Sequence, residues 1–110
     1  DLTTDPSPSK SYAYCSDTIY AESIVPIIKG CDLLYHEATF ANDLAAISKE
    51  RGHSTALEAG TIARLAEVKQ LVIGHFSSRY DEEGEQSLLA EAKSVFENTV
   101  LAKERKVFEL

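Results

Sequence analysis

Four short polar elements beside the apolar runs of this chain hold the residues with the greatest capacity for chemistry. They are Ser16-Asp17-Thr18, His36-Glu37-Ala38-Thr39, His53-Ser54-Thr55 and His75-Phe76-Ser77. One aspartate, one glutamate and three histidines near strand ends and loops form a set suited to metal-assisted hydrolysis, because imidazoles and carboxylates hold metals and move protons. The set is too small to complete a site for two metal ions. The sequence therefore predicts part of a hydrolytic site.

Each of these residues also has a simpler interpretation, and the residues alone leave both open. Asp17 stands where a helix N-cap is expected, so its carboxylate could accept an amide of the next turn. His75 closes an apolar run, where a single histidine fits a hydrogen-bonded structural role. His53 precedes a helix N-terminus, which disfavours a cationic imidazole and so invites a functional explanation. Glu37 needs a partner, for which a nearby imidazole is the obvious candidate, and His36 is expected to face the other side of its strand.

The composition limits the classes of protein and of partner. The 110 residues have room for one domain, and 44% of them are hydrophobic, which is enough for a core. The formal net charge of −7 disfavours direct binding of nucleic acid by this chain, because phosphates are bound mainly by Lys and Arg. Cys15 and Cys31 form no Cys-x-x-Cys pair and are expected to be buried free thiols, which predicts a cytoplasmic location. No apolar run approaches the ~20 residues that span a membrane.

Apolar spacing and turn residues predict alternating strands and helices after a linker at residues 1–11. Strands are predicted at 12–15, 32–36, 70–74 and 106–110, a strand or turn at 98–101, and helices at 19–29, 42–51, 56–67 and 81–96. Pro26 is expected to kink or restart its helix, and Thr55 with Glu58 has the spacing of a capping box. This order of elements predicts an α/β fold with an at least partly parallel sheet.

The four polar elements, taken in order with their neighbours, resemble the C-terminal half of ribonuclease Z. This family comprises zinc-dependent endonucleases of the metallo-β-lactamase superfamily that trim precursor tRNA at the 3′ end. The matching segments are 14–18, 36–40, 52–55 and 74–80, and the resemblance extends over nearly the whole chain from about Tyr12. It implies half of a metallo-β-lactamase-type αβ/βα sandwich over residues 12–110, with a mixed sheet and flanking helices.

The resemblance also implies a role for individual residues. Asp17 corresponds to the aspartate that bridges two zinc ions, and His75 to a histidine that ligates the second zinc. His53 corresponds to the histidine that contacts the scissile phosphate and helps to protonate the departing 3′ oxygen. Glu37 corresponds to the carboxylate that orients this imidazole.

Ser77 and Arg79 would lie near the phosphate through their proximity to His75, with a helix cap and a surface salt bridge as the alternatives. Three elements of the family are absent: its His-x-His-x-Asp-His motif, a further metal-binding histidine and the basic arm that grips tRNA. The chain is therefore expected to be a C-terminal fragment with an incomplete zinc site, inactive alone and forming a homodimer. Precursor tRNA would be the partner of the full-length protein.

Two other functions remain open at this stage. The first is a related hydrolase of the superfamily that acts on another phosphodiester or on a sulfate ester. The His36-Glu37-Ala38-Thr39 and His53-Ser54-Thr55 elements favour ribonuclease Z over this alternative, since they set that family apart. The second is a non-catalytic domain that dimerises or packs against a partner, for which the incomplete set of metal ligands is the argument.

Overall fold

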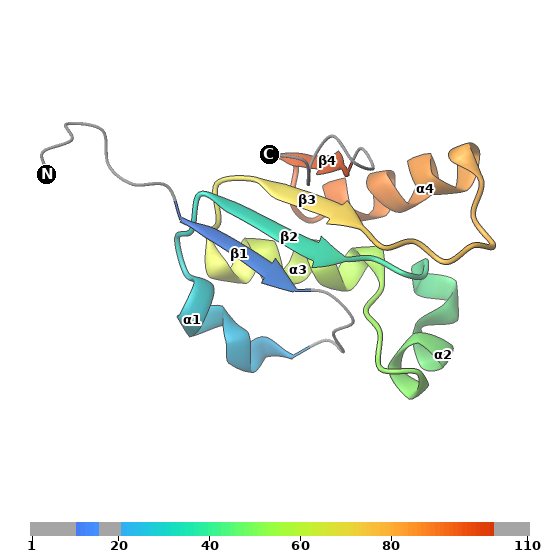
Figure 1. Cartoon of the computed structure of the whole chain (residues 1–110), viewed down its shortest axis with the longest axis horizontal. Helices are drawn as coiled ribbons and strands as arrows, with labels where there is room; N and C mark the ends of the chain where they lie inside the picture. Colours follow the sequence, from blue (N-terminus) through green and yellow to red (C-terminus); the bar gives the residue numbers. More distant parts are fainter. Residues whose placement is uncertain (1–10, 16–20, 103–110) are drawn as a thin grey trace, which may run out of the picture.

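The structure is a computed structural model that describes residues 11–15 and 21–102. These residues form a four-stranded sheet with helices beside it (Figure 1). In chain order the elements are β1 (Tyr12–Cys15), the 3₁₀ turn η1 (Glu22–Ile24), α1 (Val25–Ile28), β2 (Leu33–Glu37), the 3₁₀ turn η2 (Asn42–Leu44), α2 (Ala45–Glu50), α3 (Ala56–Ala66), β3 (Leu71–Gly74), α4 (Glu82–Lys93) and β4 (Thr99–Leu101). The strands lie in the order β1-β2-β3-β4, and each neighbouring pair is parallel.

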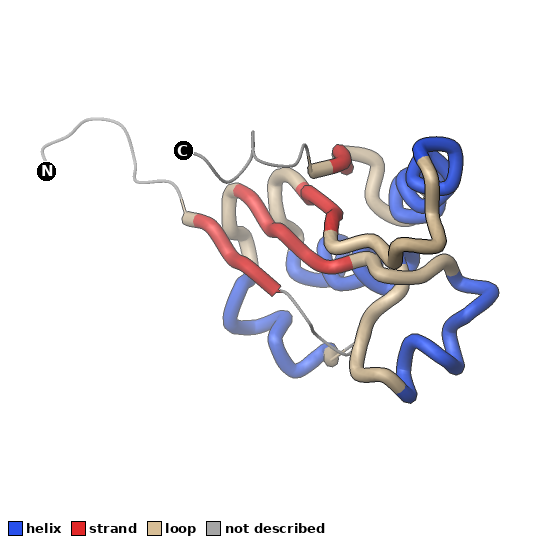
Figure 2. Tube along the Cα trace, turned by 45° about the vertical axis from the view of Figure 1, so that its right-hand side comes forward, coloured by secondary structure: helices blue, strands red, loops and turns tan. Residues whose placement is uncertain are grey.

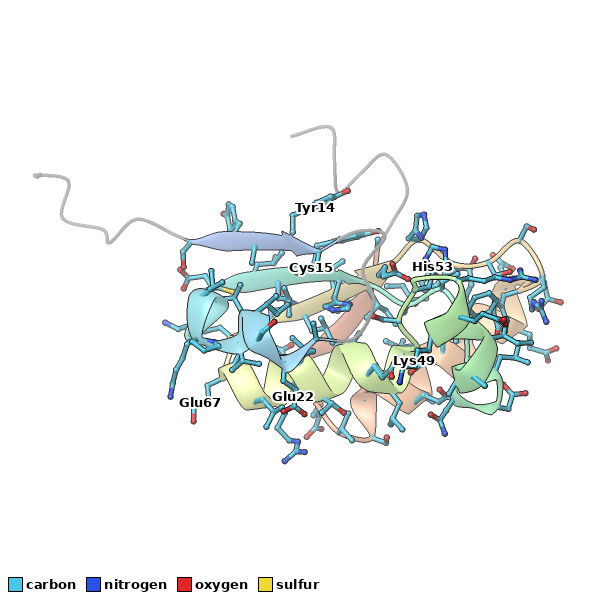
Figure 3. All side chains as sticks on the ribbon, turned by 90° about the horizontal axis from the view of Figure 1, so that it is seen from below. Tyr14, Cys15, Glu22, Lys49, His53 and Glu67 are labelled. Carbon is cyan, nitrogen blue, oxygen red and sulfur yellow. The ribbon has the colours of Figure 1, made fainter. Side chains whose placement is uncertain are left out.

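The register of the sheet shows which side chains share a face, because successive residues of a strand point to opposite sides. Leu34 pairs with Leu71, and both belong to the core beneath the helices. Tyr14 pairs with Tyr35, and their rings stack with centroids 4.6 Å apart. Figure 3 shows Tyr14 on the side of the sheet away from the helices and Cys15 on the side that faces them. In the described ranges the helices therefore cover one face of the sheet.

Small residues on α3 allow this helix to approach α4 closely. A Cβ atom at Gly60 would lie 2.5 Å from Cγ2 of Val95 and 2.7 Å from the carbonyl oxygen of Ala92, so only glycine fits there. The buried residues of α3 are Ala56, Ala59, Gly60, Ile62, Ala63 and Ala66. Leu34, Ile62, Leu71, Ile73 and Leu88 are the largest fully buried apolar side chains of the core.

A capping box fixes the start of α3. The side chain of Thr55 accepts the amide of Glu58 at 3.1 Å, and the Glu58 carboxylate accepts the amide of Thr55 at 2.9 Å. Phe40 also pairs with Thr55 in an isolated parallel bridge, which brings the segment after β2 against the start of this helix. The predicted capping box is confirmed, and it positions the loop that carries His53.

The predicted order of elements is confirmed from β1 to β4. The helices expected at 19–29 and 42–51 each divide into a 3₁₀ turn and a short helix. Pro26 stands in the first turn of α1, where a missing N–H costs little, so it restarts the helix as predicted. The helix expected to end at residue 96 ends at Lys93, and residues 99–101 form a strand.

Some expectations fall outside the described residues. These are the linker up to residue 10, the strand at 106–110 and the whole Ser16-Asp17-Thr18 element. Only parallel pairs occur within 11–15 and 21–102, so the antiparallel part of the expected mixed sheet is not found in these ranges. Cys15 and Cys31 are free thiols, and burial raises the pKa of each. The helices of the described ranges are too short or too polar to cross a membrane.

Candidate active site

The predicted site residues that the structure describes gather at one edge of the sheet. Glu37 is the last residue of β2, His75 directly follows β3, and His53 lies in the loop before α3. Figure 2 shows these three loops meeting beyond the ends of the strands. The carboxyl ends of parallel strands are where α/β proteins place functional groups, since neighbouring strands end there together.

Glu37 is fully buried, and its carboxylate accepts hydrogen bonds from His53, Thr39 and the amide of Ser54. Nδ1 of His53 lies 3.1 Å from each carboxylate oxygen. The amide of Ser54 donates to Oε2 at 3.0 Å, and the hydroxyl of Thr39 donates to the same oxygen at 2.5 Å. A buried carboxylate is costly unless it is paired and hydrogen-bonded, and these donors provide that compensation. The predicted hydrogen bond between Glu37 and the His53 ring is confirmed.

His53 connects this buried carboxylate to the surface. Its side chain is 22% exposed, against 0% for that of Glu37. Because a carboxylate only accepts, Nδ1 of His53 carries a proton, and Nε2 is the ring nitrogen that acts away from Glu37. The ring also lies edge-on to Phe40, with centroids 6.2 Å apart, and 5.5 Å from the His75 ring. Figure 3 shows His53 at the end of the sheet, beside α2.

Thr39 lies at the centre of the cluster, although no role of its own was predicted for it. Besides Glu37, its hydroxyl oxygen contacts Nδ1 of His75 at 3.1 Å, the carbonyl oxygen of His75 at 3.0 Å and Nδ1 of His53 at 3.4 Å. The spacing of Glu37 and Thr39 indicates a contact between their side chains, because residues two apart in an extended segment share a face. A threonine two residues after the glutamate is thus placed to touch its carboxylate.

His75 has an unusual backbone conformation. Its φ of 60° lies in the left-handed region, which costs a non-glycine residue about 1–3 kcal/mol and persists only where the surrounding structure holds it. The amide of Ser77 donates to the carbonyl oxygen of Thr39 at 3.0 Å and holds the turn that follows. The exposed imidazole of His75 therefore projects from a backbone that its neighbours fix.

Glu37, His53 and His75 each offer a ligand atom, and these atoms lie within 4.8 Å of one another. Imidazole nitrogens and carboxylate oxygens are ligands of catalytic metals, so the donor set fits a metal. Glu37 and His53 already satisfy each other by hydrogen bonding, whereas the ring of His75 is exposed at the edge of the cluster. This distribution favours His75 as the ligand and the other two as groups beside it. Asp17, the other predicted ligand, lies outside the described residues.

Ser77 and Arg79 follow His75 in the loop between β3 and α4. The Ser77 hydroxyl accepts the amide of Arg79 at 3.3 Å, which makes it a turn residue, close to the predicted capping alternative. Cζ of the exposed Arg79 lies 5.4 Å from the centre of the Phe40 ring, which in turn contacts His53. The guanidinium group is thus held by a cation–π contact one ring away from the histidine.

His36 lies on the opposite side of β2 from Glu37, as predicted. It is fully buried, and its Nδ1 donates to the carbonyl oxygen of Glu37 at 2.8 Å. Within residues 11–15 and 21–102, its Nε2 has no hydrogen-bonding partner. Burial lowers the pKa of His36, an effect that the hydrogen bond to Glu37 partly offsets. This histidine is therefore a neutral core residue.

Known proteins resemble this chain in sequence and in fold. No family model matches the chain. The chain is 58% identical over 104 residues to a protein named ribonuclease Z from Porphyromonas gingivalis strain W83, covering 94% of this chain and 34% of that protein. It is 57% identical over 103 residues to ribonuclease Z of Bacteroides thetaiotaomicron, covering 94% of this chain and 32% of that protein. The chain thus spans about a third of the length of the curated relatives it matches.

Two solved structures share the fold. The metallo-β-lactamase fold protein YhfI from Bacillus subtilis matches with a TM-score of 0.76 and 33% identity, over 86% of this chain and 38% of that one. The short form of human tRNase Z matches with a TM-score of 0.57 and 32% identity, over 81% of this chain and 27% of that one. Over the third of the relatives' length that it spans, the chain is therefore similar in sequence to proteins named ribonuclease Z, and it shares the fold of metallo-β-lactamase-fold proteins.

Proposed function

We propose that this chain is part of a zinc-dependent endoribonuclease that hydrolyses a phosphodiester at the 3′ end of precursor tRNA. The observation that carries the proposal is the hydrogen bond between the buried Glu37 carboxylate and Nδ1 of a partly exposed His53. The identity to proteins named ribonuclease Z and the likeness to human tRNase Z support the same activity. The longer protein contributes the rest of the domain, of which residues 12–110 form one part.

In this proposal His53 contacts the scissile phosphate and delivers a proton to the departing 3′ oxygen. Its Nδ1 is fixed on Glu37, so the proton that moves is the one on Nε2. The carboxylate of Glu37 orients the ring and stabilises it while it is cationic. Arg79, stacked on Phe40 beside His53, and Ser77 lie near the phosphate and assist its binding.

His75 and Asp17 are the residues of this chain that would hold zinc. When bound, zinc activates the phosphodiester and a water molecule toward in-line attack. Two protein ligands are fewer than a catalytic zinc site uses, so the remainder of the longer protein completes the set. For the same reason we expect the 110-residue chain alone to bind zinc weakly and to cleave no RNA.

The proposal extends to partners and location. With a net charge of −7, this chain leaves most of the binding of precursor tRNA to basic surface elsewhere in the protein. Tyr12 and Tyr14 are 72% and 63% exposed on the sheet face away from the helices. We expect the N-terminal half of the domain to cover this face in the longer protein, and a second copy to cover it in the isolated chain. The free thiols Cys15 and Cys31 support a cytoplasmic location.

The experiment compares variants of the full-length protein on precursor tRNA with a 3′ trailer. His53→Ala should keep its zinc but cleave roughly 10²–10⁴-fold more slowly, since it loses the proton donor. Asp17→Ala should lose both zinc and activity. Lys49→Ala, an exposed residue of α2, is the matched control and should leave the rate unchanged. An unchanged rate in His53→Ala, or full zinc content in Asp17→Ala, contradicts the assigned roles.

A second candidate is a hydrolase of the same fold that acts on another phosphodiester or on a sulfate ester. The observation that favours it is the TM-score of 0.76 to a protein named only for its metallo-β-lactamase fold, against 0.57 to human tRNase Z. Cleavage of a small aryl phosphodiester or sulfate by the full-length protein, without cleavage of precursor tRNA, would establish this candidate in place of the first.

A further inference from the structure

The hydroxyl group of Thr39 lies between the Glu37–His53 pair and His75. Its single proton determines which of these neighbours it donates to and which it accepts from. A threonine hydroxyl donates one hydrogen bond and accepts up to two. Its 2.5 Å contact with Oε2 of Glu37 is typical of a hydroxyl that donates to an ionised carboxylate. The carbonyl oxygen of His75, 3.0 Å away, competes less well for the same proton. The Thr39 proton is therefore directed at Glu37, and its oxygen is left to accept.

Two imidazole nitrogens lie near that oxygen. Nδ1 of His75 is 3.1 Å away and Nδ1 of His53 is 3.4 Å away. Nδ1 of His53 lies 3.1 Å from both oxygens of Glu37, so its proton goes to the carboxylate. The Thr39 oxygen therefore accepts from Nδ1–H of His75. In that tautomer the lone pair of the His75 ring is on Nε2.

The backbone of Thr39 ties the same loops together independently of its side chain. Its N–H donates to the carbonyl oxygen of Ser54 at 3.0 Å, and its carbonyl oxygen accepts the amide of Ser77 at 3.0 Å. Thr39 is 6% exposed, so its surroundings are packed. Removal of the hydroxyl group alone leaves both backbone bonds in place. A variant without the hydroxyl is therefore expected to fold.

We propose that Thr39 is a positioning residue with two effects, which rest on the proposed function. It fixes the Nδ1–H tautomer of His75, so that Nε2 is the nitrogen presented to the metal. The same hydroxyl donates to Glu37 and so helps to hold the carboxylate against His53. One side chain thus links the metal ligand to the group that moves the proton. Loss of an outer hydrogen bond of this kind typically costs about 10–100-fold in metal affinity or activity.

The test uses two substitutions of Thr39 in the full-length protein. Thr39→Val removes the hydroxyl group at nearly constant volume, and Thr39→Ser keeps it. Zinc affinity is measured by competition with a chromophoric chelator, and the cleavage of precursor tRNA is measured in single turnovers at saturating zinc. Thr39→Val should bind zinc about 10–100-fold more weakly and cleave more slowly even when saturated. Thr39→Ser should restore both quantities to nearly the wild-type values.

The outcomes separate a positioning role from packing. Wild-type zinc affinity in Thr39→Val, or equal losses in the Val and Ser variants, overturns the inference, as does the absence of zinc binding in the wild type. Thr61→Val is the control, because its hydroxyl donates to the carbonyl oxygen of Leu57 within α3, and both readouts should be unchanged. If the wild type cleaves no precursor tRNA, the proposed function fails, while the comparison of zinc affinities still decides the role of Thr39.

Discussion

Nδ1 of His53 lies 3.1 Å from both carboxylate oxygens of Glu37, although the two residues are 16 positions apart in the sequence. Glu37 ends β2, and His53 precedes the capping box of α3. The bridge between Phe40 and Thr55 and the hydrogen bond from the amide of Thr39 to the carbonyl oxygen of Ser54 bring these segments together. The pair places a buried carboxylate directly beneath a histidine that reaches the surface.

Replacement of Glu37 by glutamine should destabilise this pair while preserving its shape. The amide NH₂ group must face Nδ1 of His53 or the donors of Thr39 and Ser54, so one donor meets another. We expect the free energy of unfolding to fall by about 1–3 kcal/mol. Cleavage by the full-length protein should slow roughly 10–100-fold. Urea denaturation and single-turnover kinetics measure the two effects. Glu50→Gln, on the exposed side of α2, should change neither, and wild-type behaviour of Glu37→Gln would show that the pair has no role.

His36 should make stability depend on pH. Burial holds its pKa below the ordinary value of 6.5, so below that pH the unfolded chain binds more protons than the folded chain. The contribution of His36 to the free energy of unfolding is therefore complete above pH 6.5. It is lost as the pH falls toward the folded-state pKa, by at most about 1.4 kcal/mol per pH unit. Urea denaturation of the wild type and of His36→Leu between about pH 5 and 8 measures this slope.

The difference between the two proteins isolates His36, because the substitution leaves every other titratable group in place. The free energy of unfolding should rise more steeply with pH in the wild type than in His36→Leu, and only on the acidic side of this pH range. Identical slopes would show that His36 keeps an ordinary pKa in the folded protein.

Gly60→Ala should destabilise the contact between α3 and α4. Alanine has the better helix propensity by about 1 kcal/mol, but its Cβ atom would meet the backbone of Ala92, which cannot move aside alone. We expect a net loss of about 1–3 kcal/mol in the free energy of unfolding. Gly84→Ala in α4 is the control, since the three atoms nearest to its Cβ atom would be side-chain atoms of Tyr80 and Asp81 rather than backbone. The prediction fails if Gly60→Ala is as stable as Gly84→Ala.

The isolated chain should associate through the sheet face that carries Tyr12 and Tyr14. Both aromatic side chains are mostly exposed, and Val100 on β4 is 41% exposed. Apolar surface of this kind drives association. Light scattering should therefore show a dimer of the 110-residue chain, and Tyr12→Ser combined with Tyr14→Ser should shift it toward the monomer. Ile27→Ser on α1, 82% exposed in the wild type, is the control for general apolar exposure. A monodisperse wild-type monomer at high concentration would contradict this expectation.

The sequence by itself determined the order of the elements and several of their ends. The unbroken apolar run of β3 and the Thr55–Glu58 spacing depend on local chemistry, which acts over a few residues and needs no tertiary contact. The same local reasoning placed His36 and Glu37 on opposite faces of β2. The resemblance to ribonuclease Z then supplied the roles of Asp17, Glu37, His53 and His75, and of these the structure shows the contact between Glu37 and His53.

Only the tertiary structure decided what lies between these residues. Thr39 contacts side chains 14 and 36 positions away, and no local pattern specifies such distant partners. The left-handed backbone of His75 likewise could not be predicted locally, because even residue types that favour this region adopt it mainly where their surroundings hold them there. The sequence therefore names the chemical groups of the site, whereas the packing of three loops at one edge of the sheet decides which group each hydrogen bond reaches.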